Sequence, residues 1–347
     1  MNAGTLVNDH GAVFDPGDHW LITGVAGFIG SHLLQHLLTR GCRVRGLDNL
    51  STGYRSNLDD VARRVGEEAW TRFDFVEGDI RDREVCVSVT QSVSIVLHQA
   101  ALGSVPRSIA DPITSHAVNC TGFVNMLDAS RLSGVRRFVY AASSSTYGDE
   151  PNLPKIEDRV GRPLSPYAAT KAANESYAFA FEKAYGLECI GLRYFNVFGP
   201  RQDPNGAYAA VIPKWVDAMI AGDTVTINGN GDTSRDFCFV ANAVQANIRA
   251  ALVPSAASRA VYNVAVGERT SLAELFDLLR SELTTLGINY DIVPLYRNER
   301  PGDVRHSLAD ITKAKAALGY LPSHTIGAGL RVALPWYVEH QSRLAKQ

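Results

Sequence analysis

The chain has 347 residues, with 34 Lys or Arg, 36 Asp or Glu, and a formal net charge of −2. This balance, without a dense basic run, indicates neither a nucleic-acid-binding surface nor one for anionic membranes. No apolar stretch approaches the ~20 residues that span a bilayer, and residues 1–18 lack the basic start and apolar core of a secretory signal. At roughly 150 residues per domain the length allows one large domain or two, and we expect two lobes after an N-terminal extension.

The first predicted elements enclose a glycine-rich turn. Residues 20–22 predict a buried strand, and apolar residues at helical spacing over 29–38 predict a helix that ends at Gly41. Without Cβ atoms at the turn, a pyrophosphate can approach the backbone N–H groups and the positive end of the helix. The glycines of this turn are Gly24, Gly27 and Gly30. The pattern predicts a dinucleotide site.

A carboxylate at the end of the next predicted strand, residues 43–47, indicates which dinucleotide binds. Asp48 lies eighteen residues after Gly30. It can accept hydrogen bonds from the adenosine ribose and repel a 2′-phosphate, so NAD is favoured over NADP.

Further strand-like runs at residues 73–76, 95–97, 138–142 and 189–192 alternate with helical stretches. This alternation predicts an α/β fold with a Rossmann-like, doubly wound parallel sheet, whose ligands bind at the carboxyl ends of the strands. From about residue 200 the elements become shorter. We therefore predict an extension at 1–18, an NAD-binding domain at 19–200, and a smaller substrate-binding lobe at 201–347 that is partly interleaved with the first.

The candidate catalytic side chains follow the third of these runs. Tyr167 and Lys171 are four residues apart after Ser165-Pro166, an N-cap followed by proline at the first helical position, so both share one helix face. An adjacent ammonium and a positive nicotinamide both favour the phenolate, so Tyr167 could act as a base near neutral pH. Ser143 emerges at the sheet edge, where it could hydrogen-bond the reacting oxygen and help to pass the proton.

Six motifs in order, over about residues 20–340, resemble the extended short-chain dehydrogenases/reductases and, within them, the UDP-N-acetylglucosamine 4-epimerases that serve surface polysaccharides. They are Gly24-x-x-Gly27-x-x-Gly30, Asp79-Ile80-Arg81-Asp82, His98-Gln99-Ala100-Ala101, Ser143-Ser144-Ser145 with Tyr147-Gly148, Tyr167-x-x-x-Lys171, and Arg193-Tyr194-Phe195-Asn196-Val197-Phe198-Gly199. The resemblance implies a catalytic set of Ser143, Tyr167 and Lys171.

The resemblance also implies two sets of binding residues. NAD, held tightly and regenerated in each turnover, would contact Gly24, Gly27, Phe28, Ile29, Gly30, Asp48, Asn49, Ser51, Gly53, Asp79, Ile80, Gln99, Ala100, Ala101, Tyr167, Lys171 and Tyr194. The UDP-sugar would contact Gly103, Ser104, Ser143, Ser144, Asn196, Gln202, Ala210, Val211, Thr226, Asn228, Arg235, Arg300, Asp303 and Ser307. The two arginines suit a diphosphate, although Arg235 with Asp236, and Arg300 with Asp303, could instead form ordinary ion pairs.

The neighbours of Ser143 bear on the reaction. Dehydratases and decarboxylases of the family carry acidic residues beside the catalytic Ser or Thr, whereas this chain has Ser144 and Ser145. A 4-keto sugar formed here would turn over in the site and receive hydride on its other face, which is epimerisation. Ser307 replaces the bulky tyrosine of glucose-specific relatives, so 2-acetamido sugars are expected to fit, and UDP-glucose and UDP-galactose stay open as substrates.

Three rival functions stay open at this point: a UDP-uronic acid 4-epimerase, a nucleotide-sugar decarboxylase or dehydratase, and a non-enzymatic NAD sensor. Helical stretches at 113–133 and 167–185 could pair across a two-fold axis as a four-helix bundle, or could pack on the chain's own sheet. We expect the pairing, and hence a homodimer. We also expect a cytoplasmic protein without a metal site, because the five cysteines are scattered and lack metal-ligand spacing.

Overall fold

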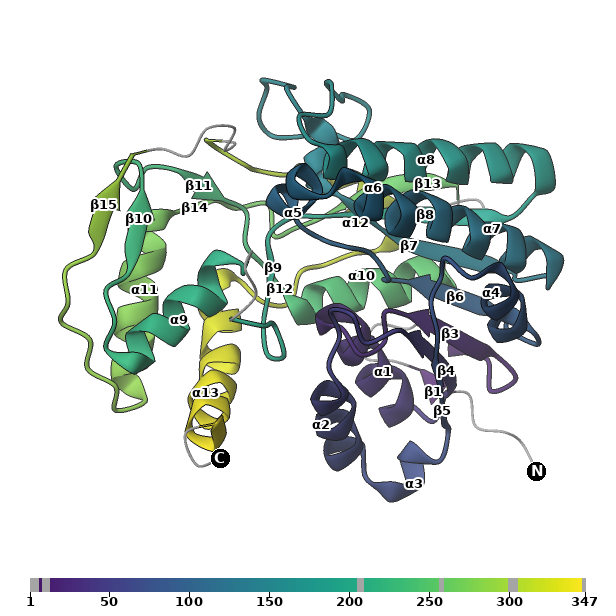
Figure 1. Cartoon of the computed structure of the whole chain (residues 1–347), viewed down its shortest axis with the longest axis horizontal. Helices are drawn as coiled ribbons and strands as arrows, with labels where there is room; N and C mark the ends of the chain where they lie inside the picture. The colour runs from purple at the N-terminus through teal and green to yellow at the C-terminus, as the bar shows by residue number, and fades with distance from the viewer. Residues whose placement is uncertain (1–5, 8–12, 205–208, 256–258, 299–304, 345–347) are drawn as a thin grey trace.

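The structure is a computed structural model that describes residues 6–7, 13–204, 209–255, 259–298 and 305–344 (Figure 1). Its centre is a seven-stranded parallel sheet in the order β13-β8-β7-β6-β3-β4-β5. The strands are β3 (His19–Thr23), β4 (Arg43–Asp48), β5 (Phe73–Glu77), β6 (Ile95–His98), β7 (Arg137–Ser143), β8 (Glu188–Tyr194) and β13 (Ala260–Val264). The predicted doubly wound fold and its strand runs are confirmed.

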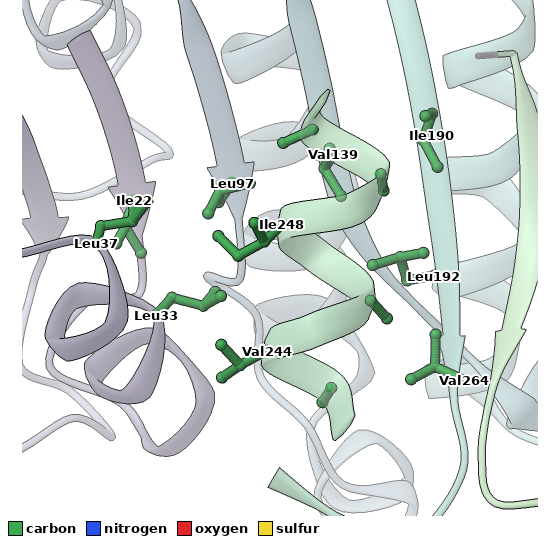
Figure 2. Packing of buried hydrophobic residues seen from close by; sticks show 14 of the residues in the cluster. Ile22, Leu33, Leu37, Leu97, Val139, Ile190, Leu192, Val244, Ile248 and Val264 are labelled. Atoms are coloured by element: carbon green, nitrogen blue, oxygen red, sulfur yellow. The ribbon is translucent and has the colours of Figure 1, made fainter. Parts of the chain in front are cut away.

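Helices cover both faces of this sheet. One face carries α1 (Phe28–Thr39), α2 (Arg55–Val65), α10 (Val240–Leu252) and α12 (Thr312–Leu318), and the other carries α4 (Arg83–Thr90), α7 (Phe123–Leu132) and α8 (Pro166–Tyr185). Figure 2 shows Val244 and Ile248 of α10 beside Leu33 of α1 and Leu97 of β6. Both faces are apolar, as parallel sheets require.

The second lobe has a core of its own. It contains α9 (Val211–Ala221), α11 (Leu272–Thr285), α13 (Ile326–Leu344), and the parallel pair β10 (Thr226–Asn228) and β15 (Leu295–Arg297). Trp215, Phe276 and Leu330 are buried together there. α10, β13 and α12 lie beyond residue 200 yet pack in the region of the main sheet.

Short elements complete the chain. They are β1 (Leu6–Val7), β2 (Val13–Phe14), α3 (Glu67–Trp70), α5 (Val105–Ala110), α6 (Pro112–His116), β9 (Val197–Phe198), β11 (Ser234–Arg235), β12 (Cys238–Phe239) and β14 (Thr270–Ser271). The helical stretch predicted at 113–133 is divided, because a π-helical segment, Ala117–Gly122, separates α6 from α7. All five cysteines are buried and free.

In the part of the chain that the structure describes, no helix combines the length and apolarity needed to cross a membrane.

Candidate active site

The glycine turn lies between β3 and α1, where the strand order reverses from β3 to β6. Gly24 has a φ of +69°, and a Cβ on it would lie 2.8 Å from the backbone nitrogen of Ala100. A Cβ on Gly30 would lie 2.1 Å from the carbonyl oxygen of Gly24. The turn therefore packs backbone against backbone, and ligands of doubly wound sheets bind at this position.

The amino end of α1 is open to a ligand. Gly27 is the N-cap residue and makes no side-chain capping bond, so the backbone N–H groups of Phe28 and Ile29 point out of the first turn without a cap. Uncapped N–H groups at a positive helix end are suited to a pyrophosphate. The turn fits the dinucleotide that the sequence predicts.

Asp48 faces this turn from the end of β4. Its Oδ2 accepts from the N–H of Ala26 at 2.9 Å, and its Oδ1 accepts from the N–H of Leu50 at 2.8 Å. Burial raises the pKa of Asp48, whereas these N–H bonds lower it. Since a carboxylate has about four acceptor positions, lone pairs are left for ribose hydroxyls.

The loop after Asp48 lies against the same turn. A Cβ on Gly53 would lie 2.9 Å from the carbonyl carbon of Ala26, so only glycine allows this approach. Ser51 is exposed, and its N–H donates to the side chain of Asn49 at 3.1 Å. Asn49 in turn donates to Asp79 Oδ2 at 2.8 Å. This bond links the residues after β4 and after β5 that are predicted to bind the adenosine of NAD.

Asp79 and Ile80 follow β5 in fixed positions. The hydrogen bonds from Arg81, opposed in part by burial, hold the pKa of Asp79 at about 2. Ile80 is buried against Gly122, where a Cβ would lie 2.6 Å from Ile80 Cδ1. A rigid apolar side chain at this edge is suited to one face of an adenine.

A buried polar network lies at the end of β6. Tyr194 donates to Gln99 Oε1 at 3.1 Å, and Asn247 Nδ2 donates to Tyr194 Oη at 2.7 Å. Gln99 Nε2 closes the ring by donating to Asn247 Oδ1 at 3.0 Å. Ala100 and Ala101 continue the chain beside it. The sequence analysis missed Asn247, which lies on α10. Nothing in the sequence relates it to Gln99 and Tyr194, which are 148 and 53 positions away.

The structure brings Ser143, Tyr167 and Lys171 together. Ser143 ends β7, while Tyr167 and Lys171 lie on the first two turns of α8, whose N-cap Ser165 accepts from Ala168. Lys171 Nζ donates to the carbonyl of Ala141 at 2.6 Å and lies 5.9 Å from the centroid of the Tyr167 ring. All three residues lie at the carboxyl edge of the sheet.

The hydrogen bonds of Ser143 leave its hydroxyl proton available. Ser143 Oγ accepts from the N–H of Ser145 at 3.1 Å and from Ser145 Oγ at 2.9 Å. With both acceptor positions used, Ser143 can donate to the oxygen of Tyr167 or to a substrate.

The electrostatics of Tyr167 differ from the sequence-based expectation. Burial raises the pKa of Tyr167, and the hydrogen bond with Ser143 lowers it only in part. Burial also lowers the pKa of Lys171 to about 8, although Cys120 and Glu175 raise it. The side chains alone therefore do not bring the phenol to neutral pH, and the positive ring of the bound cofactor is needed as well.

The π-helical segment holds the backbone near Tyr167. Asn119 accepts from the N–H of Leu102 at 2.8 Å and donates to Thr170 Oγ1 at 3.2 Å. Thr170 in turn donates to the carbonyl of Tyr167 at 2.7 Å. Asn119 is a second positioning residue that the sequence analysis missed, and π-helical turns often occur at functional sites.

The predicted sugar-binding residues come from several segments. Ser104 caps α5, Ser144 follows β7, and Gln202 donates to the carbonyl of Val197 at 3.1 Å while its Oε1 is buried without a partner among the described residues. The other described members are Gly103, Asn196, which precedes β9, Ala210 and Val211 at the start of α9, and Thr226 and Asn228 in β10. Arg300 and Asp303 lie outside the described residues.

The Arg235 and Ser307 segments are neighbours. Arg235 Nη1 donates to the carbonyls of Ser234 at 3.0 Å and Arg305 at 3.3 Å, and the N–H of Ser307 donates to the carbonyl of Ser234 at 3.0 Å. Asp236 points inward and accepts from three backbone N–H groups. β11 therefore brings a candidate diphosphate ligand and a candidate sugar contact together.

A model of the NAD dependent epimerase/dehydratase family matches residues 20–265. The chain belongs to this family. A UDP-glucose 4-epimerase of Mycolicibacterium smegmatis is 37% identical over 319 residues, which are 91% of this chain and 97% of that protein.

Two solved structures of epimerases have the same fold. A UDP-N-acetylglucosamine 4-epimerase from Methanobrevibacter ruminantium M1, in complex with UDP-N-acetylmuramic acid, is 35% identical, with a TM-score of 0.86 and coverage of 94% of this chain and 100% of that one. A UDP-glucuronic acid 4-epimerase from Bacillus cereus, with UDP-glucuronic acid and NAD, is 26% identical, with a TM-score of 0.82 and coverage of 93% and 99%. The NAD prediction is confirmed for this epimerase/dehydratase family member.

The buried charge of Lys171 is expected to lower the free energy of unfolding of this epimerase/dehydratase at neutral pH. Its native pKa of about 8 lies below its ordinary 10.5, so the unfolded chain binds more protons between these values and stability rises with pH there. Below pH 8 the buried charge lowers the free energy of unfolding by about 3 kcal/mol. Lys171→Met also removes the bond to Ala141, so we expect a net gain of about 2 kcal/mol at pH 7.

Urea denaturation at pH 7 and pH 10 measures this effect. The gain should be largely lost at pH 10. Lys183→Met on the same helix, where the side chain is 62% exposed, is the control and should change little at either pH. An equal gain from Lys171→Met at both pH values would show that buried charge is not its cause.

Proposed function

We propose that the chain is an NAD-dependent UDP-sugar 4-epimerase that interconverts UDP-N-acetylglucosamine and UDP-N-acetylgalactosamine. The observation that carries the proposal is the meeting of Ser143, at the end of β7, with Tyr167 and Lys171 on α8, where the buried Lys171 Nζ lies 5.9 Å from the centroid of the Tyr167 ring. The relatives support the reaction type, since they include 4-epimerases of UDP-glucose, UDP-N-acetylglucosamine and UDP-glucuronic acid.

The protein groups manage the proton of the C4 hydroxyl. Tyr167 Oη, as the phenolate, would take this proton while Ser143 Oγ donates a hydrogen bond to the sugar oxygen. NAD, when bound, supplies the hydride acceptor for C4. In the return step Tyr167 would give the proton back after the 4-keto sugar has rotated in the site. Because C4 would regain the hydride as well, the reaction is redox-neutral.

The two ends of the substrate need different contacts for this rotation. The UDP group has to stay fixed, and Arg235, with its planar charged fork, is the described residue best suited to a diphosphate. The sugar side instead has small residues, Gly103, Ser104, Ser144 and Ser307. Small side chains leave room for the ring to turn, and their hydroxyls can pair with an N-acetyl group in either orientation.

A direct assay tests the proposed reaction. Purified protein is incubated with UDP-N-acetylglucosamine without added cofactor, and the products are identified by NMR. The C4 epimer alone supports the proposal. A 4-keto product or release of CO₂ would indicate a dehydratase or decarboxylase, and bound NAD without turnover would indicate a sensor.

Ser307→Tyr tests the substrate preference. Ser307 is half-buried and its backbone is fixed to β11, so a larger side chain would extend into the space proposed for the acetamido group. We expect kcat/KM for UDP-N-acetylglucosamine to fall by about tenfold or more, the scale of discrimination set by pocket size. UDP-glucose should be affected less, and wild-type preference for UDP-glucuronic acid would favour the uronate rival.

Equal losses on both substrates in this variant would show that Ser307 does not select between them.

We also propose that the chain dimerises through α7 and α8. Leu132, Tyr177, Phe179 and Tyr185 are 53, 45, 61 and 57% exposed on these helices, an unusual number of large apolar groups for a free surface. A four-helix bundle across a two-fold axis would cover them. Sedimentation equilibrium measures the assembly, and a monomer at micromolar concentration would contradict it.

A further inference from the structure

A polar cavity lies between α1 and α10 and is here called the α1–α10 groove. It has a volume of about 420 Å³ and is lined by later turns of α1, including His36 and Arg40, and by Val244, Ile248 and Arg249 of α10. None of its lining residues comes from the glycine turn, and the nearest, His32, is five residues beyond Gly27, about 7.5 Å along the helix at 1.5 Å per residue. The groove is therefore separate from the glycine turn, and its volume is in the range of small-molecule sites.

Two buried donors in this groove have no acceptor in the described part of the chain. Arg40 Nη1 donates to His36 Nδ1 at 3.2 Å, so the proton of the neutral imidazole is on Nε2. Both His36 Nε2 and Arg249 Nε are buried without a hydrogen-bond partner there. Buried polar groups are nearly always paired. Both nitrogens are closed to solvent and belong to residues that line the groove, so an acceptor in the groove would reach them once the two side chains turn toward it.

The charge of the groove indicates that this acceptor is an anion. Arg40 and Arg249 both line it, and none of the described residues around it is acidic. Burial lowers the pKa of Arg249, and burial with the charge of Arg40 lowers the pKa of His36 to about 3.

The groove also has an apolar side. Val244 and Ile248 line it and belong to the buried cluster between the sheet and the two helices, shown in Figure 2. An inorganic ion alone would leave most of 420 Å³ unfilled. A ligand with an anionic group and a compact apolar body matches both sides.

We propose that the α1–α10 groove is a binding site for a small organic anion that carries a phosphate or carboxylate group. This site is independent of the UDP-sugar reaction. Its occupant would bridge the helix that starts at the glycine turn and the helix that carries Asn247, and so would stabilise their packing.

Phenyl phosphate is the probe for this site. It is titrated by calorimetry into holoenzyme that is saturated with NAD and UDP, so that the other phosphate-binding positions are filled. We expect the double variant Arg40→Gln, Arg249→Gln to bind it at least about tenfold more weakly, because charge-assisted bonds are lost. Arg280→Gln, an exposed arginine paired with Asp277 on α11, is the matched control and should bind like wild type.

Benzyl alcohol, which has the ring without the charge, should bind at least tenfold more weakly than phenyl phosphate to the wild type. Crystals of the wild-type holoenzyme soaked in selenate locate the anion directly, whatever the stability of the variants. An anomalous peak within hydrogen-bond distance of Arg249 Nε and His36 Nε2 is expected. Equal phenyl phosphate affinity in the wild type and the double variant, or no peak in the groove, would overturn the proposal.

Discussion

Tyr167→Phe is expected to lower kcat for epimerisation by at least ~100-fold, the usual contribution of a positioned acid–base group. The substitution removes only the oxygen that would take the C4 hydroxyl proton. The ring, its packing beside Lys171 and the N–H bond from Tyr167 to Ser108 Oγ all remain. Steady-state kinetics gives kcat, and calorimetry with UDP should give a Kd close to that of the wild type.

Tyr177→Phe on the same helix is the matched control, because Tyr177 is exposed and lies ten residues after Tyr167 along α8. It should leave kcat near the wild-type value. Near-normal turnover by Tyr167→Phe would remove Tyr167 from the mechanism. Loss of a deuterium label from C4 to solvent during interconversion would exclude direct hydride transfer, whatever the variant shows.

Gly30→Ala is expected to abolish NAD binding and to lower the free energy of unfolding by about 1–3 kcal/mol, the usual cost of overpacking. The new Cβ would lie 2.1 Å from the carbonyl oxygen of Gly24 and 2.9 Å from Val25 Cα. Because both contacts are with backbone, no side-chain rotation relieves them, and the turn itself has to move. Absorbance of the purified protein gives its NAD content, and urea denaturation gives its stability.

Gly327→Ala provides the comparison for this variant. Gly327 lies in α13, and the nearest atom to its added Cβ would be the end of the Arg331 side chain at 3.8 Å. Its NAD content should match the wild type, with unchanged or slightly higher stability. Full NAD content in Gly30→Ala would show that the turn can open without losing its ligand.

The elements that the sequence predicts correctly are those with strong local signals. The strand before Gly24, the helix after it and the strand ending at Asp48 are fixed by apolar period and by glycine. The π-helical segment interrupts the predicted helix at 113–133 because Asn119 bonds to Leu102 and Thr170, partners that helical periodicity does not reveal.

In the candidate site, too, the residues placed by local signals are predictable and those placed by long-range contacts are not. Ser143, Tyr167 and Lys171 meet because parallel strands end at one edge, a rule that needs only the order of the elements. Asn247 belongs to the site only through the path of α10 under the sheet. The sequence analysis also expected the pKa of Tyr167 to be lowered, whereas burial raises it. The sequence shows the adjacent ammonium but not how deeply the phenol is buried.

The place of α10 in the chain has a consequence for biosynthesis. Six of the seven strands of the sheet, including those that carry Leu97, Val139 and Ile190 on its underside, are made by residue 194, yet α10 starts only at Val240. A nascent chain that pauses between these two points would expose a broad apolar face of the sheet to solvent. Translation speed over residues 195–252, and the supply of chaperones there, should thus govern how much of the newly made enzyme escapes aggregation.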